Sequence, residues 1–134
     1  MKSKNLTMSK IKIKNFGPIK EGYQRNDGFI DIKKVTVFIG NQGSGKSTVA
    51  KTISTLTWLE KSINRGDTLI DKITFDEFKE LFRYQKIHNY FTDNTVIEYI
   101  GNKYHIIYNR NQLLKFIKIE IKGTSKNPNV NIII

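Results

Sequence analysis

The sequence has 134 residues, about one domain in length, and with 38% hydrophobic and 26% charged residues it can build a core, so intrinsic disorder is not expected. It contains no cysteine, which excludes disulfides, thiolate metal sites and cysteine nucleophiles. The 23 Lys and Arg residues against 12 Asp and Glu give a net charge of +11, which suits polyanionic partners, although lysines spread along a chain are more typical of solvated faces. Because no stretch reaches roughly 18 consecutive apolar residues and the N-terminus has no apolar signal core, we expect a cytoplasmic protein that does not cross a membrane.

The N-terminal third of the chain is predicted to be mainly β-structure. Residues 1–8 are expected to be a flexible segment. Residues 9–16 then alternate lysine with isoleucine, the period of two that predicts a strand with one face in water. Residues 29–32 follow an Asn-Asp-Gly turn and are predicted to pair with this strand in antiparallel fashion. Residues 35–39, VTVFI, are apolar almost throughout, which predicts a strand buried on both faces of a parallel or mixed sheet.

Helical spacing replaces this pattern after Ser47. Apolar side chains recur every three or four residues and predict one buried helix face that ends near Gly66, formed by Val49, Ile53, Leu56, Leu59 and Ile63. Thr74 and Glu77 have the spacing of a capping box. The short helix that follows them is predicted to carry an apolar stripe of Phe75, Phe78, Leu81 and Phe82. Residues 83–91 fit neither a helix nor a strand clearly.

The period returns to two after Asp93, which predicts antiparallel sheet in the C-terminal third. Residues 95–100 and 103–109 flank Gly101-Asn102 and are predicted to form a β-hairpin. Residues 116–122, FIKIEIK, predict another half-exposed strand, and residues 129–134 begin a further one. Tyr99, Tyr104 and Tyr108 could form an aromatic surface for single-stranded nucleic acid, but cross-strand packing is the better interpretation.

One motif in the chain carries specific chemistry. The pattern G-x-x-x-x-G-K-[ST] of a phosphate-binding loop lies between the apolar strand and the amphipathic helix, and is formed by Gly40, Asn41, Gln42, Gly43, Ser44, Gly45, Lys46 and Ser47. Glycines let successive N–H groups point at phosphate oxygens, and the helix N-terminus adds its positive dipole. We expect Lys46 to contact the β- and γ-phosphates of ATP, Ser47 to ligate Mg²⁺ and Thr48 to touch the α-phosphate.

With this loop, the runs IKIKNFGPIKEG and FIDIKKVTVFIGNQGSGKST resemble the N-terminal part of the RecF/SMC/OLD-like AAA-type ATPases over residues 9–63. The resemblance implies an α/β P-loop NTPase fold of the ABC type, with an antiparallel β-layer against the core sheet. It also implies a role in DNA repair or genome defence, DNA as a partner, and a head-to-head dimer clamped by ATP. Many relatives carry a basic residue after the Asn-Phe that ends the first strand, whereas here Gly17 follows Phe16, so we carry over no nucleotide contact at that position.

Other parts of that machinery are missing from the sequence. No apolar strand ends in the Asp and Glu of a Walker B motif, and no LSGG-like signature is present. We therefore expect residues 9–134 to be the N-terminal lobe of such a head, truncated at its C-terminus, which binds ATP without hydrolysing it. Two alternatives are a P-loop kinase for a small molecule, for which Arg83 and Arg110 would be isolated lid arginines, and a basic nucleic-acid-binding module without catalysis.

Weaker candidates for chemistry receive structural interpretations. His88 and His105 have no partner at metal-ligand spacing in the sequence. Trp58, the single tryptophan, is expected to be packed or partly exposed and not to stack on adenine.

Overall fold

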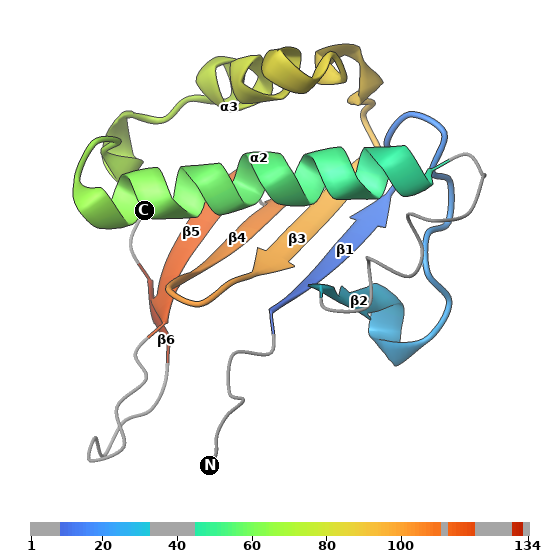
Figure 1. Ribbon diagram of the computed structural model, residues 1–134, viewed down its shortest axis with the longest axis horizontal. Helices are drawn as coiled ribbons and strands as arrows, with labels where there is room; N and C mark the ends of the chain where they lie inside the picture. The colour runs from blue at the N-terminus through green and yellow to red at the C-terminus, as the bar shows by residue number, and fades with distance from the viewer. Residues whose placement is uncertain (1–8, 33–44, 111–112, 120–129, 133–134) are drawn as a thin grey trace.

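The computed structural model describes residues 9–32, 45–110, 113–119 and 130–132. This part of the chain is an α/β structure with one six-stranded antiparallel sheet and two α-helices over the same face of it (Figure 1). The strand order is β2-β1-β3-β4-β5-β6. The strands are β1 (Lys10–Lys14), β2 (Phe29–Asp31), β3 (Val96–Ile100), β4 (Tyr104–Asn109), β5 (Leu113–Ile119) and β6 (Val130–Ile132).

The antiparallel pairings predicted from the sequence are confirmed. β1 pairs with β2, and β3 pairs with β4 through a tight turn over residues 101–103. β1 also pairs with β3, so an N-terminal strand joins the C-terminal hairpin in one sheet. The predicted apolar strand at residues 35–39 lies outside the described residues, so the sheet described here is the antiparallel one alone.

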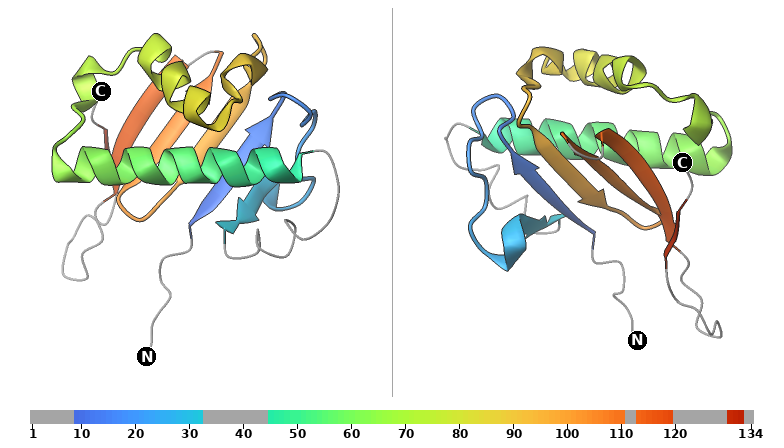
Figure 2. Two further views of the ribbon diagram at one scale, coloured as in Figure 1. Left: turned by 45° about the horizontal axis from the view of Figure 1, so that its top comes forward. Right: turned by 180° about the vertical axis from the view of Figure 1, so that it is seen from behind.

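Alternation along β1 divides the sheet into two faces. Ile11 lies opposite Ile30 on β2 and opposite Tyr99 on β3, and Ile11 and Tyr99 are buried. The lysines of β1 project to the other face, where Lys12 lies beside Phe29 and Glu98. Seen from behind in Figure 2, that second face carries no α-helix among the described elements, and only the short 3₁₀ helix η1 (Asn26–Gly28) lies at its β2 end.

The long helix α2 (Lys46–Arg65) crosses the first face of the sheet. Leu56, Leu59 and Ile63 are buried against the sheet, as the spacing predicts. The helix ends at Gly66, whose φ of 87° is left-handed and whose N–H donates to the carbonyls of Ile63 and Ser62. Glycine adopts this conformation without the steric cost that a side chain would add, so the predicted stop is confirmed.

The second helix, α3 (Phe75–Leu81), begins with the predicted capping box. The N–H of Glu77 donates to Thr74 Oγ1 at 3.2 Å, and the N–H of Thr74 donates to Glu77 Oε1 at 3.3 Å. The stretch that the sequence left ambiguous consists of two single 3₁₀ turns, η4 (Phe82–Gln85) and η5 (His88–Tyr90). A further 3₁₀ turn, η3 (Ile70–Lys72), precedes α3.

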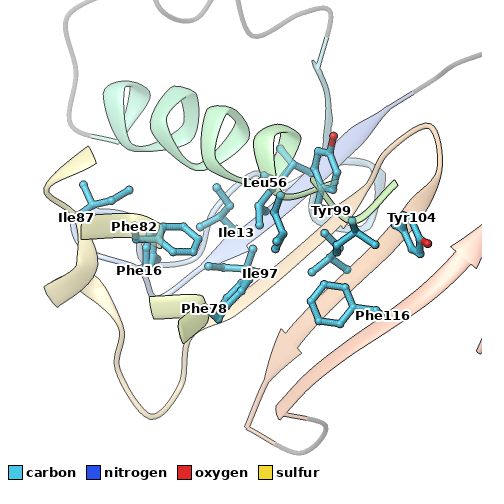
Figure 3. Packing of buried hydrophobic residues seen from close by; sticks show 14 residues of the cluster. Ile13, Phe16, Leu56, Phe78, Phe82, Ile87, Ile97, Tyr99, Tyr104 and Phe116 are labelled. Carbon is cyan, nitrogen blue, oxygen red and sulfur yellow. The ribbon is translucent and has the colours of Figure 1, made fainter. Parts of the chain in front are cut away.

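The core lies between α2, α3 and the sheet, and Figure 3 shows its packing. Aromatic rings fill the end of the core beneath α3, where Phe78 meets Phe82 edge-on at 5.2 Å and stacks on Tyr108 at 6.0 Å between centroids. The buried apolar side chains are Ile11, Ile13, Phe16, Leu56, Leu59, Ile63, Phe78, Phe82, Ile87, Ile97, Tyr99, Tyr104, Ile106 and Phe116. Tyr99 and Tyr104 therefore pack in the core, and the alternative of an exposed tyrosine surface on these strands is wrong.

The strand β5 differs from its prediction in its start. It begins at Leu113, three residues before the predicted start at Phe116. Phe116 is buried opposite Ile106, whereas Ile117 belongs to the other face of the sheet, opposite His105. An alternating sequence shows that a strand has two different faces, but both faces of β5 carry apolar residues. The packing of the helices against the sheet therefore decides which set of side chains is buried.

Candidate functional site

The candidate site is the start of α2, where the described chain resumes. Of the nine residues predicted to bind nucleotide, Gly40, Asn41, Gln42, Gly43 and Ser44 lie outside the described residues. Gly45, Lys46, Ser47 and Thr48 are described and occupy the turn into the helix and its first turn.

Gly45 makes the turn that starts the helix. Its φ of 99° is left-handed, and its carbonyl accepts the N–H of Val49 at 2.9 Å. A residue with a side chain would be strained in this conformation, and its Cβ would also lie 3.3 Å from Ile19 Cγ1. A glycine is thus required at this point by the backbone itself, independently of any ligand.

The first turn of α2 has the electrostatic character of an anion site. It contains no acidic residue, and no side chain caps its N-terminus among the described residues. Helix N-termini have N–H groups that lack acceptors within the helix, together with the positive end of the helix dipole. Ser47 is exposed, whereas Thr48 is 4% exposed, so these two neighbouring hydroxyl residues have different access to solvent.

A cavity of about 380 Å³ opens beside this turn. Its wall is mostly apolar and comes from four places: β1, the loop after β1, β2 and the start of α2. Lys46 and Val49 contribute from the helix, and Ile19 and Tyr23 from the loop. The size falls in the range of small-ligand pockets, which run from about 300 to 1,000 Å³. The sequence analysis did not assign the loop residues to the site, because the only feature that it found there was the Gly17-Pro18 break after the first strand.

Metal-binding chemistry has little support outside Ser47. Within the described ranges, no cluster of three or more His, Asp or Glu side chains is arranged to hold a metal ion. The hydroxyl of Ser47 alone would be a single ligand, which suits Mg²⁺ delivered with a nucleotide, because Mg²⁺ usually keeps several waters and binds phosphate oxygens.

Among the residues that the structure describes, no helix is long and apolar enough to cross a bilayer.

The structure also shows a polar group on the open face of the sheet that the sequence did not reveal. His105 Nε2 lies 2.7 Å from Glu98 Oε2, and Lys12 Nζ lies 4.0 Å from Glu98 Oε1. The hydrogen bond from His105 is the main cause that lowers the pKa of Glu98, and the charges of His105 and Lys12 act in the same direction. The register of the β3–β4 hairpin brings Glu98 and His105 together. The position of the turn sets this register, so the predicted turn was the one sequence feature from which the contact could have been inferred.

Buried Glu60 is the second polar residue that sequence reasoning missed. It is 5% exposed, and its carboxylate faces the β3–β4 turn from α2. Tyr99 Oη donates to Oε1 at 2.9 Å, and the N–H groups of Lys103 and Tyr104 donate to Oε2 at 2.5 and 2.9 Å. Burial is the main cause that raises the pKa of Tyr99, so its hydroxyl keeps the proton that it donates to Glu60, and Thr57 Oγ1 lies 3.3 Å from the same hydroxyl. Glu60 therefore fastens the hairpin to the helix.

The chain was compared with protein families, with curated proteins and with solved structures, and none of the three comparisons finds a match. The function is therefore argued from the residues and their geometry.

Proposed function

We propose that this chain is the ATP-binding lobe of an AAA/ABC-type ATPase with a P-loop NTPase fold, of the DNA-repair or genome-defence group. The observation that carries the proposal is the start of α2: a left-handed glycine is followed by Lys46 and an exposed Ser47 at the N-terminus of a 20-residue helix. The sequence motif that ends at these residues requires this turn and this helix.

Each described residue has a distinct role in this proposal. Lys46 supplies a positive charge to the β- and γ-phosphates, and the N–H groups of the first turn donate to phosphate oxygens. Ser47 is oriented to solvent and can share a Mg²⁺ ion with the nucleotide. The apolar cavity beside Lys46 is near enough to hold part of the nucleoside, with Tyr23 and Ile19 in its wall.

Binding and hydrolysis are separate in this proposal. Hydrolysis needs an acid that holds the metal and a carboxylate that positions water, and a second head completes the charge shell. The sequence supplies only the P-loop share of these groups, so we expect ATP binding with essentially no turnover. The intact protein is proposed to form a head-to-head dimer and to act on DNA.

The alternative of a small-molecule kinase gains no support from Arg83. This arginine is an exposed residue whose Nη2 lies 2.8 Å from Glu80 Oε2, one turn earlier in the chain. A lid arginine would instead have to reach the transferred phosphate.

A binding titration tests the role of Lys46. Lys46→Ala is expected to weaken the binding of a fluorescent ATP analogue by at least about tenfold, because a charge-assisted bond contributes roughly 1.5 to 3 kcal/mol. Lys51→Ala is the matched control, since it removes the same charge from the same helix five residues later. If Lys46→Ala and Lys51→Ala bind the analogue as the wild type does, the proposed function is wrong.

A second titration, with Mg²⁺ and with EDTA, separates Ser47 from Lys46. Ser47→Ala is expected to weaken binding only when Mg²⁺ is present, because its hydroxyl is the proposed metal ligand. Ser54→Ala removes another exposed hydroxyl from α2 and is the control. A loss of affinity by the same factor with and without the metal contradicts the role given to Ser47.

A further inference from the structure

One side of α2 faces solvent along its whole length. The side chains of this stripe recur at spacings of four and three residues, so they lie above one another on the helix. All are exposed except Lys51, which is half-buried. The α2 stripe consists of Ser47, Lys51, Ser54, Trp58, Lys61 and Arg65.

The charges of the α2 stripe all have one sign. The helix contains a single acidic residue, Glu60, whose carboxylate is turned away toward the β3–β4 hairpin. Arg65 is paired with Asp67 at 2.8 Å beyond the end of the helix. None of the ion pairs found in the described part of the chain involves Lys51 or Lys61. The stripe is therefore a cationic track about 21 Å long from Lys51 to Arg65, at 1.5 Å per residue.

Trp58 stands at the centre of this track and is 52% exposed. Along the stripe, Trp58 follows Lys51 by two turns and precedes Lys61 by one turn, and none of its neighbours on the stripe is apolar. A second exposed aromatic residue is nearby in the fold: Gln85 Nε2 donates to Ser54 Oγ at 3.4 Å, which brings η4 and its 87% exposed Tyr84 alongside the stripe.

We propose that the α2 stripe binds single-stranded nucleic acid, with Lys51 and Lys61 on the phosphates and an unstacked base on Trp58. An exposed aromatic ring between lysines is the combination that holds single strands without sequence preference, since every base has a face that stacks. An anionic membrane surface would also attract the lysines, but it needs a broad apolar face, and Trp58 is the single apolar side chain of the stripe. The proposal does not depend on ATP binding.

The single tryptophan of the chain makes the proposal directly measurable. Oligothymidylate of about 12 nucleotides is expected to quench the fluorescence of Trp58 when it is titrated into the full chain without nucleotide. In a polarisation assay with the same oligomer labelled, Trp58→Ala should weaken binding about fivefold or more. Trp58→Phe should retain most of the affinity, because a phenyl ring also stacks on a base. Both substitutions lie on the surface, so neither is expected to change the fold.

Salt dependence tests the lysines. Lys51→Ala/Lys61→Ala should lower the slope of log affinity against log salt by about 1.4, at 0.7 for each phosphate contact of a single strand. The matched control is Lys14→Ala/Lys115→Ala, which removes the same charge from the open face of the sheet, on the side away from α2. Lys46→Ala should bind the oligomer as the wild type does, so that failure of the nucleotide proposal and failure of this one are distinguishable.

Several results would overturn the proposal. They are absence of quenching and of oligomer binding at low salt, equal weakening by the control pair, and unchanged affinity in Trp58→Ala. Binding only to vesicles of phosphatidylcholine and phosphatidylserine, with no oligomer bound, would assign the stripe to a membrane surface instead.

Discussion

Substitution of Glu60 tests whether hydrogen bonds to a buried carboxylate hold the β3–β4 hairpin against α2. The carboxylate is 5% exposed, and among the described residues no cation lies within 4.0 Å of it. Its charge is stabilised by the three donors alone: Tyr99 Oη and the N–H groups of Lys103 and Tyr104. Two effects of opposite sign therefore meet at this residue, the hydrogen bonds and the desolvation of the charge.

Glu60→Ala removes every acceptor at once. Tyr99 can turn its hydroxyl to Thr57 Oγ1, which lies 3.3 Å away, but the two backbone N–H groups have no other acceptor in their contacts. The N–H of Tyr104 is buried and that of Lys103 is partly buried. A buried donor without an acceptor costs about 1 to 3 kcal/mol and a partly buried one costs less, so we expect the free energy of unfolding to fall by about 2 to 4 kcal/mol. This is a large part of the roughly 5 to 15 kcal/mol that stabilises a typical domain.

Glu60→Gln keeps the geometry and removes the charge. Its amide oxygen can accept from Lys103 and Tyr104, and its NH₂ group can donate to Tyr99 Oη, which then donates to Thr57. Only the charge-assisted part of the bonds is lost, so a smaller decrease of about 1 to 2 kcal/mol is expected. Tyr99→Phe, which removes one of the three donors, should also cost less than Glu60→Ala.

Urea unfolding followed by far-UV circular dichroism measures these differences on the full chain. The expected order of stability is wild type, then Glu60→Gln, then Glu60→Ala. If Glu60→Gln is as stable as the wild type or more so, desolvation of the charge outweighs the hydrogen bonds. If Glu60→Gln and Glu60→Ala are equally destabilised, the acceptor that Gln keeps for the hairpin N–H groups contributes nothing, and the reasoning fails.

Three further predictions concern the pH dependence of stability and the helix ends. The folded-state pKa of Glu98 lies below its usual 4.5, so the stability that Glu98 contributes is complete above that pH and is lost as the pH falls through the folded value. Urea unfolding between pH 6 and about pH 3 should show a flatter decline for Glu98→Gln, and parallel curves would contradict this. Gly66→Ala should cost about 1 to 2 kcal/mol, because φ is 87° although space for a Cβ is open; equal urea midpoints would exclude the strain. Thr74→Ala should cost about 0.5 to 2 kcal/mol through loss of the cap of α3, and Thr74→Ser should recover most of that loss in the same measurement.

Local signals in the sequence predicted most elements of the described fold. The alternation along β1, the helical spacing up to Gly66 and the pairing of Thr74 with Glu77 each depend on neighbours within a few residues. Such features are determined by backbone sterics, side-chain periodicity and caps, which act over the same short range. The candidate nucleotide site belongs to this class, because a P-loop is a contiguous motif, and its described end at Gly45 and Lys46 has the helix start that the motif requires.

Only the tertiary structure decided which side chains of an alternating strand face the core and which polar groups form hydrogen bonds with one another. Phe116 is buried and Ile117 faces the other side, because α2 and α3 cover one face of a sheet whose alternation fits either. Glu60 looks like a solvated helix residue in the sequence, yet it accepts three bonds from a hairpin about 40 residues later. These contacts join segments far apart in the chain, so their energies depend on packing that no short stretch of sequence contains.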